Sequence, residues 1–193
     1  MEFKGFPKIA RLNRDIIITE KIDGTNAQVY IKELGDEEVM PTDTPIVAVV
    51  GKLLLYAGSR TRWITPEDDN YGFARWVKEH AEELVQLGTG QHFGEWWGQG
   101  IQRKYGLTEK RFSLFNTSRW GESRPSCCQV VPELYRGLFN TQIINSTLRA
   151  LSETGSLAAS GFMKPEGIVI FHTANNHLYK VTLEGDEKGK GEV

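Results

Sequence analysis

The sequence predicts an α+β protein in which strands outnumber helices. Runs rich in β-branched and aromatic residues recur along the chain, and turn-forming clusters separate many of them. Only two segments carry apolar residues at helical spacing. Hydrophobic residues make up 39% and charged residues 25% of the 193 residues, close to the average for globular proteins. The composition therefore excludes a disordered or fibrous chain.

Strands are expected wherever β-branched and aromatic residues cluster. The nine expected strands are 16–19, 27–33, 46–50, 52–56, 91–97, 111–115, 127–131, 168–172 and 178–182. Turn-forming residues occupy 40–45 and 121–126. The pair Asn175-Asn176 predicts a hairpin turn between the two final strands.

The clearer helix is predicted over 66–87, because Thr65 can cap its start, Pro66 suits a first turn and Gly88 can end it. A second helix is predicted over 141–153, with Gly155 as its C-terminal breaker. The length predicts one domain, which we place over residues 1–183. Residues 184–193 are charged and rich in glycine, and a flexible tail is expected there.

Charge and cysteine content narrow the class of protein further. The formal net charge of −2 argues against a uniformly basic nucleic-acid binder but leaves room for a local basic groove. The only cysteines, Cys127 and Cys128, are adjacent, where a disulfide would be strained, so a reducing setting is expected. Neither a secretory signal nor a run of about 18 apolar residues occurs. We expect a soluble, cytoplasmic protein without a membrane partner.

The most informative segment is 20–26, which reads Glu-Lys-Ile-Asp-Gly-Thr-Asn between two predicted strands. Lys21 is the candidate nucleophile, and its amine can attack only when cationic neighbours, a metal or desolvation favour loss of its proton. Asp23 and Gly24 would shape the turn and allow a nucleotide to approach the backbone closely. Taken alone, the segment fits a β-hairpin with a solvated lysine equally well.

Five further segments with polar or aromatic candidates follow in order. They are Ser59-Arg60, 93–98 around Glu95, 111–116 around Phe115, 164–170 around Glu166 and 179–182 around Lys180. Each of them alone also fits an ordinary basic loop, buried strand or turn. Their order and spacing make coincidence less attractive.

Together these segments resemble the covalent nucleotidyltransferases, a superfamily of ATP-dependent DNA ligases, RNA ligases and mRNA capping enzymes. Members share a Lys-x-Asp-Gly nucleophile motif followed by five spaced motifs. The wording of 20–26 is most similar to RNA ligases of the second phage type, and the resemblance runs from about Phe6 to Thr182. It implies a nucleotidyltransferase domain of the ATP-grasp-like ligase type, with mainly antiparallel sheets and a few helices.

The resemblance also implies roles for individual residues. Lys21 would form the covalent bond to AMP, and Lys180 would act on the α-phosphate. Residues expected to bind the nucleotide are Glu20, Asp23, Gly24, Asn26, Arg60, Glu95, Phe115 and Glu166. Among these, Phe115 would stack on the adenine and Arg60 would contact the phosphates or ribose. Glu95 and Glu166 would also hold a metal ion, so the implied cofactors are ATP and Mg²⁺ or Mn²⁺.

Two positions depart from the family pattern. Asn116 stands where relatives often carry an acid, and Thr182 stands where the family places a second lysine. Lys180 would then act alone or with Lys188 or Lys190 from the tail. The segment 99–106 adds Arg103 and Lys104, which could meet nucleic-acid phosphates.

The activity implied is that of an ATP-dependent polynucleotide ligase acting on RNA. AMP would pass from Lys21 to a 5′-phosphate, and a 3′-hydroxyl would then seal the strand, as in RNA repair. The expected partners are RNA or DNA ends carrying these groups, and a protein that supplies nucleic-acid affinity. Three alternatives stay open: a DNA ligase with the same chemistry, a guanylyl-transferring capping enzyme, and a nucleic-acid-binding relic without full activity.

Overall fold

The computed structural model describes residues 2–41 and 44–185. Contacts group the chain into two compact units, unit 1 from Met1–Lys21 with Pro132–Val193, and unit 2 from Ile22–Val131. The expectation of a single domain over 1–183 did not anticipate this division and stays a prediction. Most of the expected tail, 186–193, lies outside the described residues.

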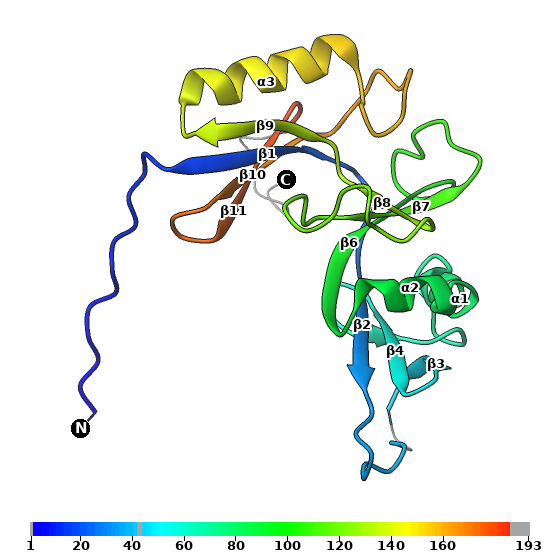
Figure 1. Ribbon diagram of the computed structural model, residues 1–193. Coiled ribbons are helices and arrows are strands. Elements are labelled where there is room, and N and C mark those ends of the chain that lie inside the picture. The colour runs from blue at the N-terminus through cyan, green and yellow to red at the C-terminus, as the bar shows by residue number, and fades with distance from the viewer. Residues whose placement is uncertain (1, 42–43, 186–193) are drawn as a thin grey trace. The chain divides into compact units, whose positions relative to one another are not determined.

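Unit 1 is built on a four-stranded antiparallel sheet with the order β11-β10-β1-β9. Its strands are β1 (Asp15–Lys21), β9 (Glu133–Leu138), β10 (Gly167–His172) and β11 (His177–Thr182). The helix α3 (Thr141–Thr154) runs along this sheet in Figure 1. Its side chains meet a small core of Ile16, Ile18, Leu151, Ile168 and Ile170.

Local chemistry explains both ends of α3. The side-chain oxygen of Asn140 accepts hydrogen bonds from the backbone N–H groups of Gln142 and Ile143, which caps the helix start. Gly155, with φ of 81°, ends it. The predicted second helix and its glycine breaker are therefore confirmed.

Unit 2 contains a seven-stranded sheet with the order β3-β4-β2-β6-β7-β8, and β5 pairs with β4. The strands are β2 (Thr25–Glu33), β3 (Ile46–Val50), β4 (Leu53–Gly58), β5 (Trp63–Ile64), β6 (Gly90–Gly98), β7 (Lys110–Leu114) and β8 (Cys128–Val130). The pair β7–β8 is parallel, and the other pairings are antiparallel. The mixed, mainly antiparallel α+β class is thus confirmed.

One face of the unit 2 sheet packs against the helices α1 (Phe73–Glu79) and α2 (Ala81–Leu84) and the 3₁₀ turn η1 (Val85–Leu87). Alternate residues of each strand point to this core, including Val29, Trp96 and Phe112. The intervening residues point to the opposite face. That face carries the candidate residues Asn26, Glu95 and Phe115.

The predicted helix over 66–87 is wrong in its extent. Residues 66–72 form turns, and the helical segment begins only at Phe73 and breaks at His80. Asp69 favours this later start, because its carboxylate accepts hydrogen bonds from the N–H groups of Asn70, Ala74 and Arg75. Thr65 accepts from the N–H of Asp68 instead of capping a helix.

All nine expected strands are present, and their ends differ from the predicted ones by at most two residues. The hairpin at Asn175-Asn176 is also present, and Asn176 has the left-handed φ of 51° that such turns favour. The strands β5 and β9 were not predicted. Within the part of the chain that the structure describes, no helix has the length and apolar content needed to cross a membrane.

Candidate functional site

Lys21 is the last residue of β1 in unit 1, and its ammonium group forms an ion pair with Glu166. The distance from Lys21 Nζ to Glu166 Oε2 is 2.5 Å. The two side chains are 22% and 13% exposed, so both are largely enclosed yet accessible. The contact joins residues 145 positions apart, because β1 and β10 pair in antiparallel register with Lys21 opposite Gly167.

Gly167 explains why a glycine follows Glu166. It has φ of 154°, and a Cβ there would overlap the carbonyl oxygen of Val181 on β11. A larger residue would therefore push β10 and β11 apart. Glycine at this position keeps the strand that carries Glu166 closely paired.

Lys180 and Lys21 lie on the same face of the unit 1 sheet. Thr19 pairs with Val169, and Val169 pairs with Lys180, so the three side chains share a face. In the next row Lys21, Gly167 and Thr182 are opposite one another. Thr182 thus occupies the position where a second lysine would join this face, whereas Lys188 and Lys190 fall outside the described residues.

Glu20 faces the opposite side of β1 and is only 1% exposed. Its carboxylate accepts hydrogen bonds from the Ser156 hydroxyl at 2.5 Å, the Leu157 N–H at 2.8 Å and the Ala158 N–H at 3.0 Å. These donors belong to the loop after α3. The side chain of Glu20 therefore anchors that loop to the strand that ends in Lys21, and a role in nucleotide binding stays a prediction.

In unit 2, Asp23 and Gly24 are held by three side chains. The Asp23 carboxylate accepts from Arg103 Nε at 3.0 Å, and the Asp23 N–H donates to the Tyr105 hydroxyl at 2.7 Å. The Gly24 N–H donates to Glu95 Oε1 at 3.0 Å. A Cβ on Gly24 would lie 2.5 Å from the Trp96 carbonyl oxygen, so only glycine fits.

Asn26, Glu95 and Phe115 share one face of the unit 2 sheet. Asn26 is opposite Glu95 in the β2–β6 pairing, and the N–H of Phe115 donates to the carbonyl of Phe93. Phe93 and Phe115 are 46% and 39% exposed, whereas Phe112 is fully buried. The prediction that Phe112 and Phe115 point in opposite directions is confirmed.

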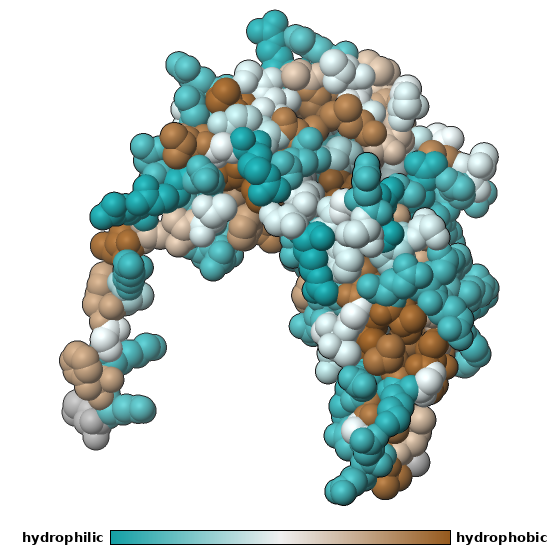
Figure 2. All heavy atoms as spheres, in the orientation of Figure 1, coloured by the Kyte–Doolittle hydropathy of each residue, from teal (hydrophilic) through white to brown (hydrophobic). Residues whose placement is uncertain are grey.

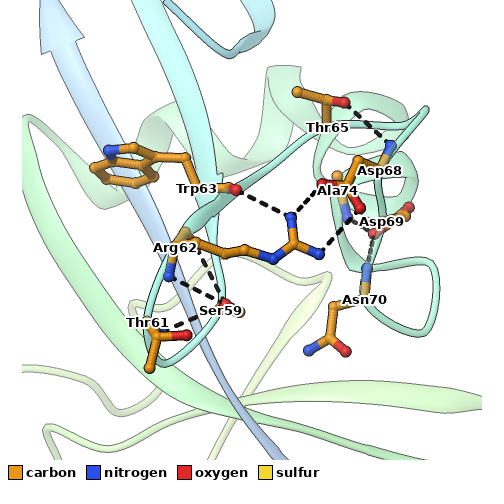
Figure 3. Close-up of polar contacts among 9 residues, drawn as sticks. All are labelled: Ser59, Thr61, Arg62, Trp63, Thr65, Asp68, Asp69, Asn70 and Ala74. Carbon is orange, nitrogen blue, oxygen red and sulfur yellow. Dashed lines mark hydrogen bonds and ion pairs between the residues drawn. The ribbon is translucent and has the colours of Figure 1, made fainter.

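The loop after β4 carries two arginines in different surroundings, and Figure 3 shows the contacts of Arg62. Arg62 donates to both carboxylate oxygens of Asp68, at 2.5 and 3.0 Å, and its N–H donates to Ser59 Oγ. Arg60 is exposed and makes no hydrogen bond or ion pair with any residue that the structure describes. Arg60 is therefore the cation that this loop leaves available for a ligand.

Glu95 and Glu166 have the hard oxygen donors that Mg²⁺ and Mn²⁺ prefer. Over residues 2–41 and 44–185, however, no group of three or more His, Cys, Asp or Glu residues could hold a metal ion. Each carboxylate therefore suits a divalent cation in donor chemistry, and the role of the two glutamates as metal ligands stays a prediction. Magnesium bound with a nucleotide usually takes only one or two carboxylates, with substrate phosphates and water as its other ligands.

Three residues of these clusters were not assigned a role in them from the sequence. Phe93 could have been found, because it alternates with Glu95 along β6 and so shares its face. Arg103 and Tyr105 reach Asp23 from a loop far along the chain. No local pattern indicates that contact.

Comparison with known proteins agrees with the order of the motifs. A family model described as RNA ligase matches residues 14–182. Solved structures of Naegleria gruberi RNA ligase are similar at 19% identity, including a variant with AMP and Mn (TM-score 0.59, covering 89% of this chain and 50% of that chain). A variant with ATP and Mn gives a TM-score of 0.58, with 88% and 49% covered. A structure of this ligase with PPi gives a TM-score of 0.57, with 88% and 50% covered.

These structural similarities establish a shared fold, and this chain spans about half the length of the Naegleria proteins. No curated protein matches the sequence. The family match covers most of the chain, from the start of β1 to the end of β11. The chain therefore belongs to the RNA ligase family.

Proposed function

We propose that the chain is an ATP-dependent RNA ligase that works through a lysyl-AMP intermediate. The observation that carries this proposal is the enclosed ion pair between Lys21 and Glu166, the first and fifth of the six motif segments. Family membership and relatives with ATP, AMP and PPi support the same chemistry. The wording of 20–26 favours the second phage type, and the six ordered segments favour a nucleotidyltransferase domain of the ATP-grasp-like type.

In the first step Lys21 Nζ attacks the α-phosphorus of ATP, a P–N bond forms and pyrophosphate leaves. The attacking amine must be neutral, so the Lys21 ammonium that is paired with Glu166 has to lose a proton before the attack. Lys180, on the same face of the sheet, offsets negative charge on the α-phosphate and the leaving group. Arg60, without a protein partner in the described part of the chain, contributes a planar guanidinium to the phosphates.

The remaining side chains bind and orient the nucleotide. Phe115 offers an exposed ring for the adenine, and Asn26 and Glu95 offer polar groups for the ribose. Asp23 and Gly24 shape the backbone beside it, and Glu20 fixes the strand before Lys21. A bound Mg²⁺ or Mn²⁺, held by Glu95 and Glu166, would neutralise charge on the triphosphate.

In the second step AMP passes from Lys21 to the 5′-phosphate of a strand, which leaves the lysine amine free again. In the third step a 3′-hydroxyl attacks this activated phosphate, a phosphodiester bond forms and AMP is released. The substrates are therefore RNA ends with a 5′-phosphate and a 3′-hydroxyl. We include among the partners a protein that adds nucleic-acid affinity, and we place the protein in the cytoplasm.

A relic that binds nucleic acid without catalysis is the second candidate. Thr182 favours it, because this residue occupies the row of Lys21 where relatives place a second lysine. The relic would bind strands but release no pyrophosphate. A DNA ligase would share the first step and differ only in the strands that it joins.

Intact-mass analysis after incubation with ATP and MgCl₂ tests the proposal. We expect the wild-type chain to gain one AMP and release pyrophosphate, and Lys21→Ala to gain none. Lys52→Ala, which alters an exposed lysine in unit 2, is the matched control and should react normally. Reaction with GTP instead of ATP would indicate a capping enzyme, and absence of any adduct in the wild type would favour the relic. Sealing of nicked RNA and nicked DNA then distinguishes the two ligases.

A further inference from the structure

The loop between β6 and β7 has an unusual backbone. Gln102, Lys104 and Tyr105 take left-handed φ angles of 43°, 61° and 51°. They are three of the five non-glycine residues with positive φ in the described part of the chain. Such angles are unfavourable for residues with a side chain and persist only where the surroundings hold them. The shape of this loop therefore points to a specific task.

Two side chains of the loop hold the same residue, Asp23. Arg103 Nε donates to the Asp23 carboxylate at 3.0 Å, with both side chains more than two-thirds buried. The Tyr105 hydroxyl accepts the backbone N–H of Asp23 at 2.7 Å. Asp23 is thus fixed through both its side chain and its main chain, two positions after Lys21.

Tyr105 is itself firmly placed. It is 3% exposed and packs edge-to-face on Trp97 of β6, with ring centroids 4.9 Å apart. Trp97 Nε1 in turn donates to Ser113 Oγ of β7 at 2.9 Å. The hydroxyl that accepts from Asp23 is therefore positioned by the sheet.

Glu95 completes the arrangement by accepting the N–H of the next residue, Gly24. Consecutive backbone amides of the Lys-x-Asp-Gly segment are thus held by side chains from β6 and from the loop that follows it. Arg103 differs from its neighbour Lys104, because Arg103 pairs with Asp23 and Lys104 is exposed. The expectation that both cations meet nucleic-acid phosphates stays a prediction.

We propose that Arg103 and Tyr105 are positioning residues for the nucleophile segment. They act through Asp23, holding the turn after Lys21 in the conformation needed for transfer of AMP to the lysine. This proposal rests on the proposed function. It does not require RNA, because the first step uses ATP alone.

The test has two readouts on six variants: Tyr105→Phe, Arg103→Ala, Arg103→Lys, Asp23→Ala, the double variant Asp23→Ala/Arg103→Ala and the control Thr108→Ala, which alters an exposed residue of the same loop. The first readout is amide hydrogen exchange at Asp23 and Gly24 by NMR, which needs no activity. The second is the rate of AMP transfer to Lys21, measured over a range of ATP concentrations in the absence of RNA. Thermal unfolding of each variant checks the fold.

We expect Tyr105→Phe to speed exchange at Asp23 at least tenfold, because the N–H loses its acceptor. Arg103→Ala should lower the rate at saturating ATP at least tenfold and change the half-saturating ATP concentration less than threefold. Arg103→Lys should restore part of the rate, and Thr108→Ala should match the wild type. In the double variant Asp23→Ala/Arg103→Ala the losses should not add, since the two residues act as one unit.

Some outcomes would overturn the proposal. If Arg103→Ala slows only sealing of RNA and leaves the first step intact, Arg103 is a phosphate contact. If exchange at Asp23 is the same in Tyr105→Phe and the wild type, the positioning contact does not exist in solution. If the wild type forms no AMP adduct but its Asp23 and Gly24 amides are protected from exchange, the proposed function and the catalytic role of Arg103 and Tyr105 are both wrong. The contacts with these two amides would still be real.

Discussion

The two units hold their candidate residues in different ways. In unit 1 the key contacts join distant parts of the chain, because Lys21 meets Glu166 and Glu20 meets Ser156. In unit 2 the candidates come from one continuous segment, 22–131, and lie on the strands β2 and β6 or in the turns and loops next to strands. The carboxylate of Glu20 is buried, whereas Phe115 and Arg60 are exposed. Substitutions in unit 1 should therefore disturb stability and activity together, and those on the exposed face of unit 2 should separate them.

The largest expected effect on stability is that of Glu20→Ala. Removing the buried carboxylate leaves the Ser156 hydroxyl and the amides of Leu157 and Ala158 without their acceptor. Leaving these three donors without an acceptor lowers the free energy of unfolding by about 3 kcal/mol. Urea denaturation followed by circular dichroism measures it.

Glu153→Ala is the control in the same unit, because Glu153 forms only an exposed pair with Arg149. It should change the free energy of unfolding by less than about 0.5 kcal/mol. Equal losses for both glutamates would mean that the contacts of Glu20 do not stabilise unit 1.

Gly24→Ala should have the next largest effect. An added Cβ would lie 2.5 Å from the Trp96 carbonyl oxygen and 2.6 Å from Trp97 Cβ, so the turn after Lys21 must shift. We expect a loss of about 1–3 kcal/mol in stability and at least a tenfold loss in the rate of AMP transfer. Stopped reactions with ATP followed by intact-mass analysis give the rate.

Gly121→Ala provides the matched control in unit 2, since a Cβ at Gly121 meets nothing within 4 Å. Its rate and stability should stay close to those of the wild type. A normal rate in Gly24→Ala would show that the close approach of this turn to β6 is not needed for the reaction.

The smallest expected effect is a pH dependence in unit 2 due to His92. Burial lowers the pKa of His92, and the nearby charge of Arg119 lowers it further, although the Gly88 carbonyl that accepts from Nε2 raises it. Its folded-state pKa thus lies below the unfolded value of about 6.5. The stability contribution is full above that value and is lost as the pH falls through the folded pKa.

Urea midpoints at about pH 7.5 and pH 5.5 measure this dependence. The midpoint of the wild type should fall at the lower pH, and His92→Gln should show a smaller fall. His177→Gln, which alters an exposed histidine of unit 1, should keep the wild-type difference. An unchanged difference in His92→Gln would assign the pH dependence to other groups.

Much of the fold could be predicted because local patterns dominate it. The nine strands were found from their β-branched and aromatic residues, but β9 was missed because its charged residues Glu133 and Arg136 pair with each other on an edge strand. The helix expected over 66–87 failed for a specific reason. Asp69 binds backbone amides from a turn, a competition that apolar periodicity does not reveal.

The candidate site was predicted only in part. The order of the motifs indicated Lys21 and Glu166, and the structure brings their side chains together. The burial of Glu20 depends on a loop 136 residues away. The contacts of Arg103 and Tyr105 depend on a loop in which Gln102, Lys104 and Tyr105 take left-handed angles that such residues do not favour. These features arise from tertiary structure, which single-sequence patterns do not encode.

Mapping the AMP adduct to a single residue is the most direct test of the lysyl-AMP mechanism. After reaction with ATP and MgCl₂, the chain is digested and the modified peptide is sequenced by mass spectrometry. We expect one acid-labile adduct, on the Lys21 side chain, joined by a P–N bond. An adduct on any other residue, or one that persists in Lys21→Ala, would rule this mechanism out.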